Sequence, residues 1–250
     1  MRRTVLTILP LLLAVAACAH GPSKKERDQA EIHHGLGIEA LRNHRPQDAM
    51  REFDAALAVD DAFPEAHLGR GVAYEMFGRA ADAEREYRRA IELRPDYSEA
   101  HNDLGQLLAR NGRPQEALAQ FDAALANMYY ANPYDARLNR ALVLYYQLGR
   151  RDEGTAELRN LLSQAPRHCG ALRELGRIQI EQGRTGDALE LFERWSRACE
   201  RDTNSWFQVG LAHLKRGEAD QARAAFEKCE EMGADGEVAN ECRHRRELLQ

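Results

Sequence analysis

The chain has 250 residues, of which 44% are hydrophobic and 30% charged, so it can bury a core and is not disordered throughout. Aromatic residues make up only 7%, and the abundance of Ala, Leu, Arg and Glu favours helices over a sheet. The 35 basic and 40 acidic residues give a net charge of −5. This excludes the basic whole-chain surface that is typical of nucleic-acid-binding domains.

The N-terminus predicts export and lipidation. Two arginines precede an apolar run at residues 5–14, which is too short to span a bilayer and suits the core of a signal peptide. The run leads to Val-Ala-Ala-Cys at residues 15–18, which resembles the lipobox of bacterial lipoproteins. The resemblance implies a signal peptide at residues 1–17, a covalent lipid on Cys18 and a polar tether over residues 18–29. The alternative is a plain secretory signal with a chance cysteine.

The residue after Cys18 bears on the membrane that receives the protein. In bacterial lipoprotein sorting, an aspartate at that position retains a protein in the inner membrane. This chain has Ala19 instead. We therefore expect a lipid anchor in the outer membrane, with the protein facing the periplasm. Apart from the lipid on Cys18, we expect no cofactor.

Residues 30–236 repeat at a spacing of 34. Small residues recur at positions 8, 20 and 27, a large apolar residue at position 24, and glycine at position 15. Small residues let two antiparallel helices approach closely, and glycine can supply the left-handed turn between them. The pattern resembles the tetratricopeptide repeat (TPR) family, which implies an all-α solenoid of helix-turn-helix units. The six predicted units are residues 30–63, 64–97, 98–131, 135–168, 169–202 and 203–236.

Two parts of the array depart from the regular pattern. In the fourth unit, Leu142 takes the place of the small residue at position 8, and Gly154 and Leu161 replace the alanines at positions 20 and 27. We expect that unit to pack less regularly. Residues 237–250 predict a capping helix with an apolar face and a charged outer face, as the end of a solenoid requires. The apolar face comprises Val238, Cys242 and Leu249.

Four cysteines remain after lipidation, and an even number in an exported chain suggests disulfides with three possible connectivities. Cys169 opens the first helix of the fifth unit and Cys199 closes its second, so antiparallel packing brings them together. Cys229 lies late in the sixth unit and Cys242 on the cap that packs against it. We predict the pairs Cys169–Cys199 and Cys229–Cys242. The alternative is four buried free thiols. A zinc site is disfavoured because no CxxC spacing occurs.

Catalytic motifs are absent from the sequence. It contains no HExxH, no GxSxG and no phosphate-binding loop, so we expect neither an enzyme nor a small-molecule substrate. Three histidines, His33, His67 and His101, recur at position 4 of successive units. Their recurrence indicates a part of the repeat framework, and we expect no metal site.

The first helices of such units line a concave face, to which positions 2, 5, 9, 12 and 13 contribute one helical stripe. This stripe is apolar in the first two units and again in the sixth. The predicted partner-binding residues are Ile38, Leu41, Leu68, Val72, Met76, Phe207, Leu211 and Leu214. An apolar groove of this kind suits an amphipathic helix or a strand of another protein. Alternatively, some of these side chains merely pack against neighbouring units, or the tether covers them. In the third unit the stripe is polar, at Glu99, Asn102, Gln106, Ala109 and Arg110.

A lipobox followed by six such units is similar to the pilotin lipoproteins of type IV pili, of the PilF and PilW type. The extra residues 132–134 between the third and fourth units also resemble that family, and the added cysteines are most similar to its myxobacterial members. The resemblance implies a protein that binds secretin subunits and promotes their assembly in the outer membrane, for pilus biogenesis and pilus-dependent motility. The alternative is a TPR lipoprotein that serves as an adaptor of β-barrel assembly or of peptidoglycan hydrolases.

Overall fold

The computed structural model describes residues 21–233 and 236–249, and in this part of the chain the only regular elements are helices. The predicted signal peptide and Cys18 lie outside these residues. A short π-helix, Val143–Gln147, follows α7. The α-helices are α1 (Lys24–Arg42), α2 (Pro46–Val59), α3 (Pro64–Met76), α4 (Ala80–Leu93), α5 (Ser98–Arg110), α6 (Pro114–Ala126), α7 (Pro133–Leu142), α8 (Arg151–Gln164), α9 (Cys169–Glu181), α10 (Thr185–Ala198), α11 (Thr203–Lys215), α12 (Ala219–Gly233) and α13 (Glu237–Glu247).

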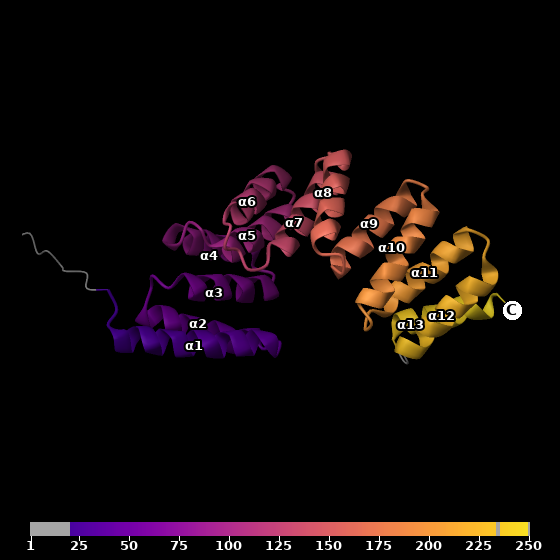
Figure 1. The fold of residues 1–250 in the computed structure, drawn as a ribbon. Helices are drawn as coiled ribbons and strands as arrows, with labels where there is room; N and C mark the ends of the chain where they lie inside the picture. The colour runs from indigo at the N-terminus through magenta and orange to yellow at the C-terminus, as the bar shows by residue number, and fades with distance from the viewer. Residues whose placement is uncertain (1–20, 234–235, 250) are drawn as a thin grey trace, which may run out of the picture.

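The first twelve α-helices form six antiparallel hairpins that follow one another along an arch, from α1 at one end to α13 at the other (Figure 1). Each hairpin packs against the next, and α13 covers the last one by packing mainly on α12. The predicted all-α solenoid of six helix-turn-helix units with a C-terminal capping helix is therefore confirmed. None of the helices in the described residues is both long and apolar enough to cross a bilayer.

Glycine and an aromatic ring meet inside five of the six hairpins. A Cβ atom on the glycine at position 8 would lie only 2.4 to 2.6 Å from Cε1 of the ring at position 24, which is well inside van der Waals contact. The small residue therefore admits the ring between the two helices, as the repeat pattern predicted. The five pairs are Gly37–Phe53, Gly71–Tyr87, Gly105–Phe121, Gly176–Phe192 and Gly210–Phe226.

The turn between the two helices of each unit contains one residue with a left-handed backbone. In five units it is the glycine at position 15, with φ between 68° and 77°, as predicted from its conformational freedom. In the first unit His44 takes this place with φ 54°. A side chain in this region of φ/ψ space is strained, so the first turn is the least favourable of the six.

The fourth hairpin is built differently from the other five. Its first helix changes to π-helical geometry after Leu142, and the backbone N–H of Leu148 donates to the carbonyl oxygen of Val143 at 3.0 Å. The close approach comes instead from Gly154 on α8, where a Cβ would lie 2.6 Å from the carbonyl oxygen of Ala141. In this hairpin the glycine at the close contact thus lies on the second helix instead of the first. This difference explains the irregular packing that the sequence predicted.

Helix α1 begins earlier than the sequence analysis expected. Residues 24–29 were assigned to the tether, but they are the first residues of α1. Ser23 caps this helix: its Oγ accepts a hydrogen bond from the backbone N–H of Glu26 at 3.3 Å, and the Glu26 carboxylate accepts one from the Ser23 N–H at 2.7 Å. This reciprocal pair is a capping box. The sequence signal was Ser followed three residues later by Glu, and it was overlooked.

The four cysteines of the described residues form the two predicted pairs. Cys169 is joined to Cys199 and Cys229 to Cys242, each with a Cα–Cα separation of 6.1 Å. The second pair is fully buried and links α12 to the capping helix α13. Beside it, Val238 packs against the same apolar cluster.

Candidate functional site

Two adjoining cavities lie on the side of the arch that the first helices of the hairpins line. The larger, of about 390 Å³, lies between α3 and α5, and the smaller, of about 180 Å³, lies between α5 and the fourth hairpin. They share Gln106 and Arg110, and we call the pair the central hollow. The larger cavity is lined by Val72, Glu75, Met76, Tyr87, Asp103, Gln106 and Arg110. The smaller is lined by Gln106, Ala109, Arg110, Phe121, Asn139, Leu142, Val143 and Gln147.

Of the eight residues predicted to bind a partner, Val72 and Met76 line the central hollow. Met76 is 43% exposed, whereas Val72 is half-buried against the cluster that contains Tyr87. Leu68 packs against the same cluster and also against the one around Tyr97. It therefore supports the contact between the second and third units.

The other five predicted residues lie away from the hollow. Ile38 and Leu41 pack against the core of the first hairpin, around Phe53. The three residues of the sixth unit pack against the cluster that holds the Cys229–Cys242 disulfide. All five are half-buried rather than exposed. The structure thus divides the predicted groove into separate patches. The residues of the sixth unit are Phe207, Leu211 and Leu214.

The floor of the larger cavity is polar. The Tyr87 hydroxyl donates a hydrogen bond to Oε1 of Glu75 at 2.7 Å, and the Arg110 guanidinium forms an ion pair with Oε2 of the same carboxylate. Burial, together with the neighbouring Glu75 carboxylate, raises the pKa of the Tyr87 hydroxyl. This tyrosine therefore remains a neutral donor and fixes the orientation of Glu75.

Asp103 lies in the same cavity and has a different environment. Burial raises the pKa of its carboxyl to about 6, and the neighbouring Glu75 and Glu99 add to the rise. Asn102 donates a hydrogen bond to its Oδ1 at 3.2 Å. Sequence analysis missed this residue because position 6 is outside the five-position stripe. Position 6 nevertheless lies three residues before Gln106 at position 9, so the two side chains are neighbours on the helix surface. That spacing was the signal in the sequence that could have identified Asp103.

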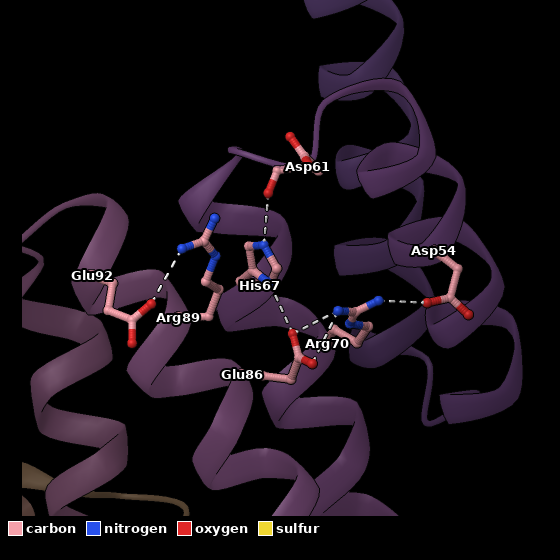
Figure 2. Close-up of polar contacts among 7 residues, drawn as sticks. All are labelled: Asp54, Asp61, His67, Arg70, Glu86, Arg89 and Glu92. Atoms are coloured by element: carbon pink, nitrogen blue, oxygen red, sulfur yellow. Dashed lines mark hydrogen bonds and ion pairs between the residues drawn. The ribbon is translucent and has the colours of Figure 1, made fainter.

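A polar network joins the first two hairpins through α2, α3 and α4 (Figure 2). The His67 ring lies 2.8 Å from the Glu86 carboxylate through Nδ1 and 3.1 Å from the carbonyl oxygen of Asp61 through Nε2. Arg70 donates to Glu86 and to Asp54 on α2. Although burial opposes ionisation of Glu86, the hydrogen bonds from His67 and Arg70 hold the pKa of its carboxyl below the usual value.

The other two position-4 histidines make the same contact. Nδ1 lies 2.8 Å from Glu52 in His33 and 2.8 Å from Gln120 in His101. Each contact joins the two helices of one hairpin, which supports the framework role that the recurrence predicted. No group of three or more His, Cys, Asp or Glu side chains that could hold a metal ion occurs within residues 21–233 and 236–249.

The start of the array carries an apolar edge that sequence analysis also missed. Ile32 and Leu36, at positions 3 and 7 of the first unit, are 64% and 46% exposed. At the same positions of the third unit, Ala100 and Leu104 are buried where α5 packs on α4. The first unit has no preceding hairpin in the described residues, and this explains the difference in exposure.

The TPR sequence model matches residues 34–98, 77–136 and 139–203, and a second TPR model matches residues 203–232. The chain belongs to the tetratricopeptide repeat family. Repeats of this family stack into extended concave surfaces, which typically bind other proteins. A search among curated proteins finds no sequence match.

Several solved structures share the fold over most of the chain. The crystal structure of PilW, a widely conserved type IV pilus biogenesis factor, is 26% identical in sequence, with a TM-score of 0.74 over 85% of this chain and 97% of PilW. PilF of Pseudomonas aeruginosa is 16% identical, with a TM-score of 0.74 over 88% of this chain and 99% of PilF. A TPR protein of Parabacteroides merdae is 23% identical, with a TM-score of 0.64 over 88% of this chain and 84% of its own. The last two likenesses show the fold alone.

Proposed function

We propose that this protein is an outer-membrane pilotin lipoprotein, which binds secretin subunits of a type IV pilus machine and promotes their assembly. The observation that carries the proposal is the likeness to PilW, which extends over 97% of PilW at 26% identity. An isolated pair of repeats would match many TPR proteins, but an array of the same length is more specific. The lipobox at residues 15–18 supports the proposed location.

The proposed mechanism is scaffolding without catalysis. The lipid on Cys18 holds the solenoid at the periplasmic face of the outer membrane. The central hollow then receives a segment of a secretin subunit before that subunit inserts into the membrane. The hollow has an apolar rim, formed by Val72 and Met76, beside a polar floor. Such a surface suits an amphipathic segment, because it offers burial to one face and hydrogen bonds to the other.

Met76→Glu provides the sharpest test of the hollow. We expect this substitution to reduce secretin multimers in the membrane fraction at least tenfold, because a carboxylate at the apolar rim must be desolvated when a partner binds. Multimers are measured by immunoblotting in a strain that lacks the native gene and carries the variant. Since Met76 is 43% exposed, we expect its substitution to leave the fold intact, whereas Leu68 and Val72 pack against the core.

The matched control is Met232→Glu, because Met232 is 37% exposed and lies on α12, away from the hollow. We expect multimers at the wild-type level in this control. Wild-type multimer levels in the Met76→Glu strain would reject the hollow as the secretin site. Normal multimers in a strain without the gene would reject the pilotin proposal altogether, and would favour a role in β-barrel assembly or the docking of peptidoglycan hydrolases.

Cys18→Ala tests the proposed anchor. Without the thiol no acyl group can be attached, so we expect the protein to leave the membrane fraction and the secretin multimers to be lost. Fractionation followed by immunoblotting measures both effects. A variant that stays in the outer membrane, or that supports normal assembly from another fraction, would contradict the role assigned to the lipid.

A further inference from the structure

The two carboxylates in the larger cavity of the central hollow are neutralised unequally. Glu75 accepts the Tyr87 hydroxyl on one oxygen and pairs with Arg110 through the other. The Asp103 carboxylate accepts a hydrogen bond from the neutral amide of Asn102 and has no ion pair among the described residues. The cavity therefore holds two acidic groups and one basic group. Arg110 is in contact with Glu75 and acts on the Asp103 carboxyl only from a greater distance, where its effect is smaller than that of burial.

The environment of the Asp103 carboxyl opposes its ionisation. Burial raises the pKa of the Asp103 carboxyl to about 6, and the nearby Glu75 and Glu99 act in the same direction. At neutral pH the carboxylate is thus charged in a site that disfavours its charge. A cation placed beside it would offset this cost, since an opposite charge at close range stabilises the ionised form.

The walls of the cavity restrict what kind of cation fits. Val72 and Met76 form an apolar side, and Gln106 offers an amide at the boundary with the smaller cavity. The volume of about 390 Å³ lies at the lower end of the range for ligand pockets, roughly 300–1,000 Å³. Lysine and arginine combine an apolar stem with a charged head, so one such side chain matches both the walls and the floor.

We propose that the cavity between α3 and α5 receives a single lysine or arginine side chain of the client protein, with its charged head at Asp103 and its stem against Val72 and Met76. The inference deepens the proposed function, since it specifies the chemistry by which the hollow recognises a secretin segment. In this proposal Asp103 selects a basic side chain of the client. The apolar rim cannot make that selection, because burial of apolar surface alone is not directional.

Selection of peptides tests the proposal without the secretin. A random peptide library is panned against the full-length protein purified in detergent, and the best binders are resynthesised with norleucine in place of each basic residue. We expect one lysine or arginine, flanked by apolar residues, whose replacement weakens binding at least tenfold. In Asp103→Asn the same replacement should have almost no effect. The isosteric control Asp187→Asn, at a side chain that is 67% exposed on α10, should keep the full preference.

The pH dependence supplies a second readout. Lowering the pH from 7.5 to 5 protonates Asp103, so the lysine peptide should bind several-fold more weakly to the wild type. The Asp103→Asn variant should show no such loss, and it therefore separates Asp103 from the other charged groups near it, which are Glu75, Glu99 and Arg110. Thermal melting of the same variant checks that it is folded.

The outcomes distinguish this inference from the proposed function. Selected peptides without a basic residue, no selected peptides at all, or an undiminished lysine preference in Asp103→Asn would overturn the inference. A cavity that binds only water or an inorganic cation would also overturn the inference, because norleucine would then replace lysine without loss of peptide affinity. If Met76→Glu still abolishes secretin multimers in that case, the pilotin proposal stands and only the basic side chain is rejected.

Discussion

Replacing both Cys229 and Cys242 with alanine is expected to lower the free energy of unfolding by about 3 kcal/mol. The disulfide closes a loop of 13 residues, and loop-closure entropy of the unfolded chain accounts for an effect of this size. Both sulfur atoms are buried in the cluster around Phe226, so the substitution also removes apolar contacts. Since α13 packs mainly on α12, we expect the cap to open first.

Urea denaturation measures the loss, and hydrogen exchange locates it. Amides of α13 should exchange faster in the Cys229→Ala/Cys242→Ala variant and remain protected in the matched Cys169→Ala/Cys199→Ala variant, whose disulfide lies in the fifth unit. Unchanged protection of α13 in the first variant would show that packing alone holds the cap. Peptide mapping without reductant tests the pairing itself, because a fragment that joins Cys169 to Cys229 would contradict both assignments.

The sequence predicted those parts of the fold that recur. A glycine at position 8 and an aromatic ring at position 24, as in Gly105 and Phe121, predict a close contact between the two helices. A residue larger than glycine at position 8 would clash with the ring. The repeat spacing then places the six hairpins and the Cys169–Cys199 pair, and the cap that packs on the sixth hairpin brings Cys242 close to Cys229. The start of α1 was missed because it lies outside the repeat, where only the local capping signal of Ser23 and Glu26 marks it.

The candidate site was less predictable, for a physical reason. A helical stripe tells which side chains share a face, but not which of them a neighbouring unit covers. Ile38 and Val72 occupy the same repeat position, yet Ile38 packs into its own hairpin while Val72 lines the hollow. The polarity of the hollow depends on Asp103 and Arg110, which come from the next unit. Contacts between units determine the site, and the sequence of a single unit does not contain them.

Gly37→Ala is expected to lower the free energy of unfolding by about 1–3 kcal/mol, the usual cost of overpacking a core. A Cβ at this position would lie 2.5 Å from Cε1 of Phe53. The ring cannot move away, because it is fully buried and its Cε1–Cζ edge also faces Gly69, where a Cβ would lie 2.4 Å from Cζ. The Phe53 ring is therefore confined between the first and second units, and a single methyl group should disturb both.

Gly35→Ala, two residues earlier on the same helix, is the matched control. Nothing lies within 4 Å of a Cβ at Gly35, so alanine should stabilise the protein by about 0.5–1 kcal/mol through its better helix propensity. Chemical denaturation measures the free energy of unfolding of both variants, which should fall for Gly37→Ala and rise for Gly35→Ala. Adding Phe53→Leu to Gly37→Ala should cost less than the sum of the two single changes, because the smaller side chain gives the methyl group room. Strict additivity, or a stabilising Gly37→Ala, would mean that the ring does not confine this helix. The close packing of the first two hairpins, and with it the position of α3 beside the hollow, would then need another explanation.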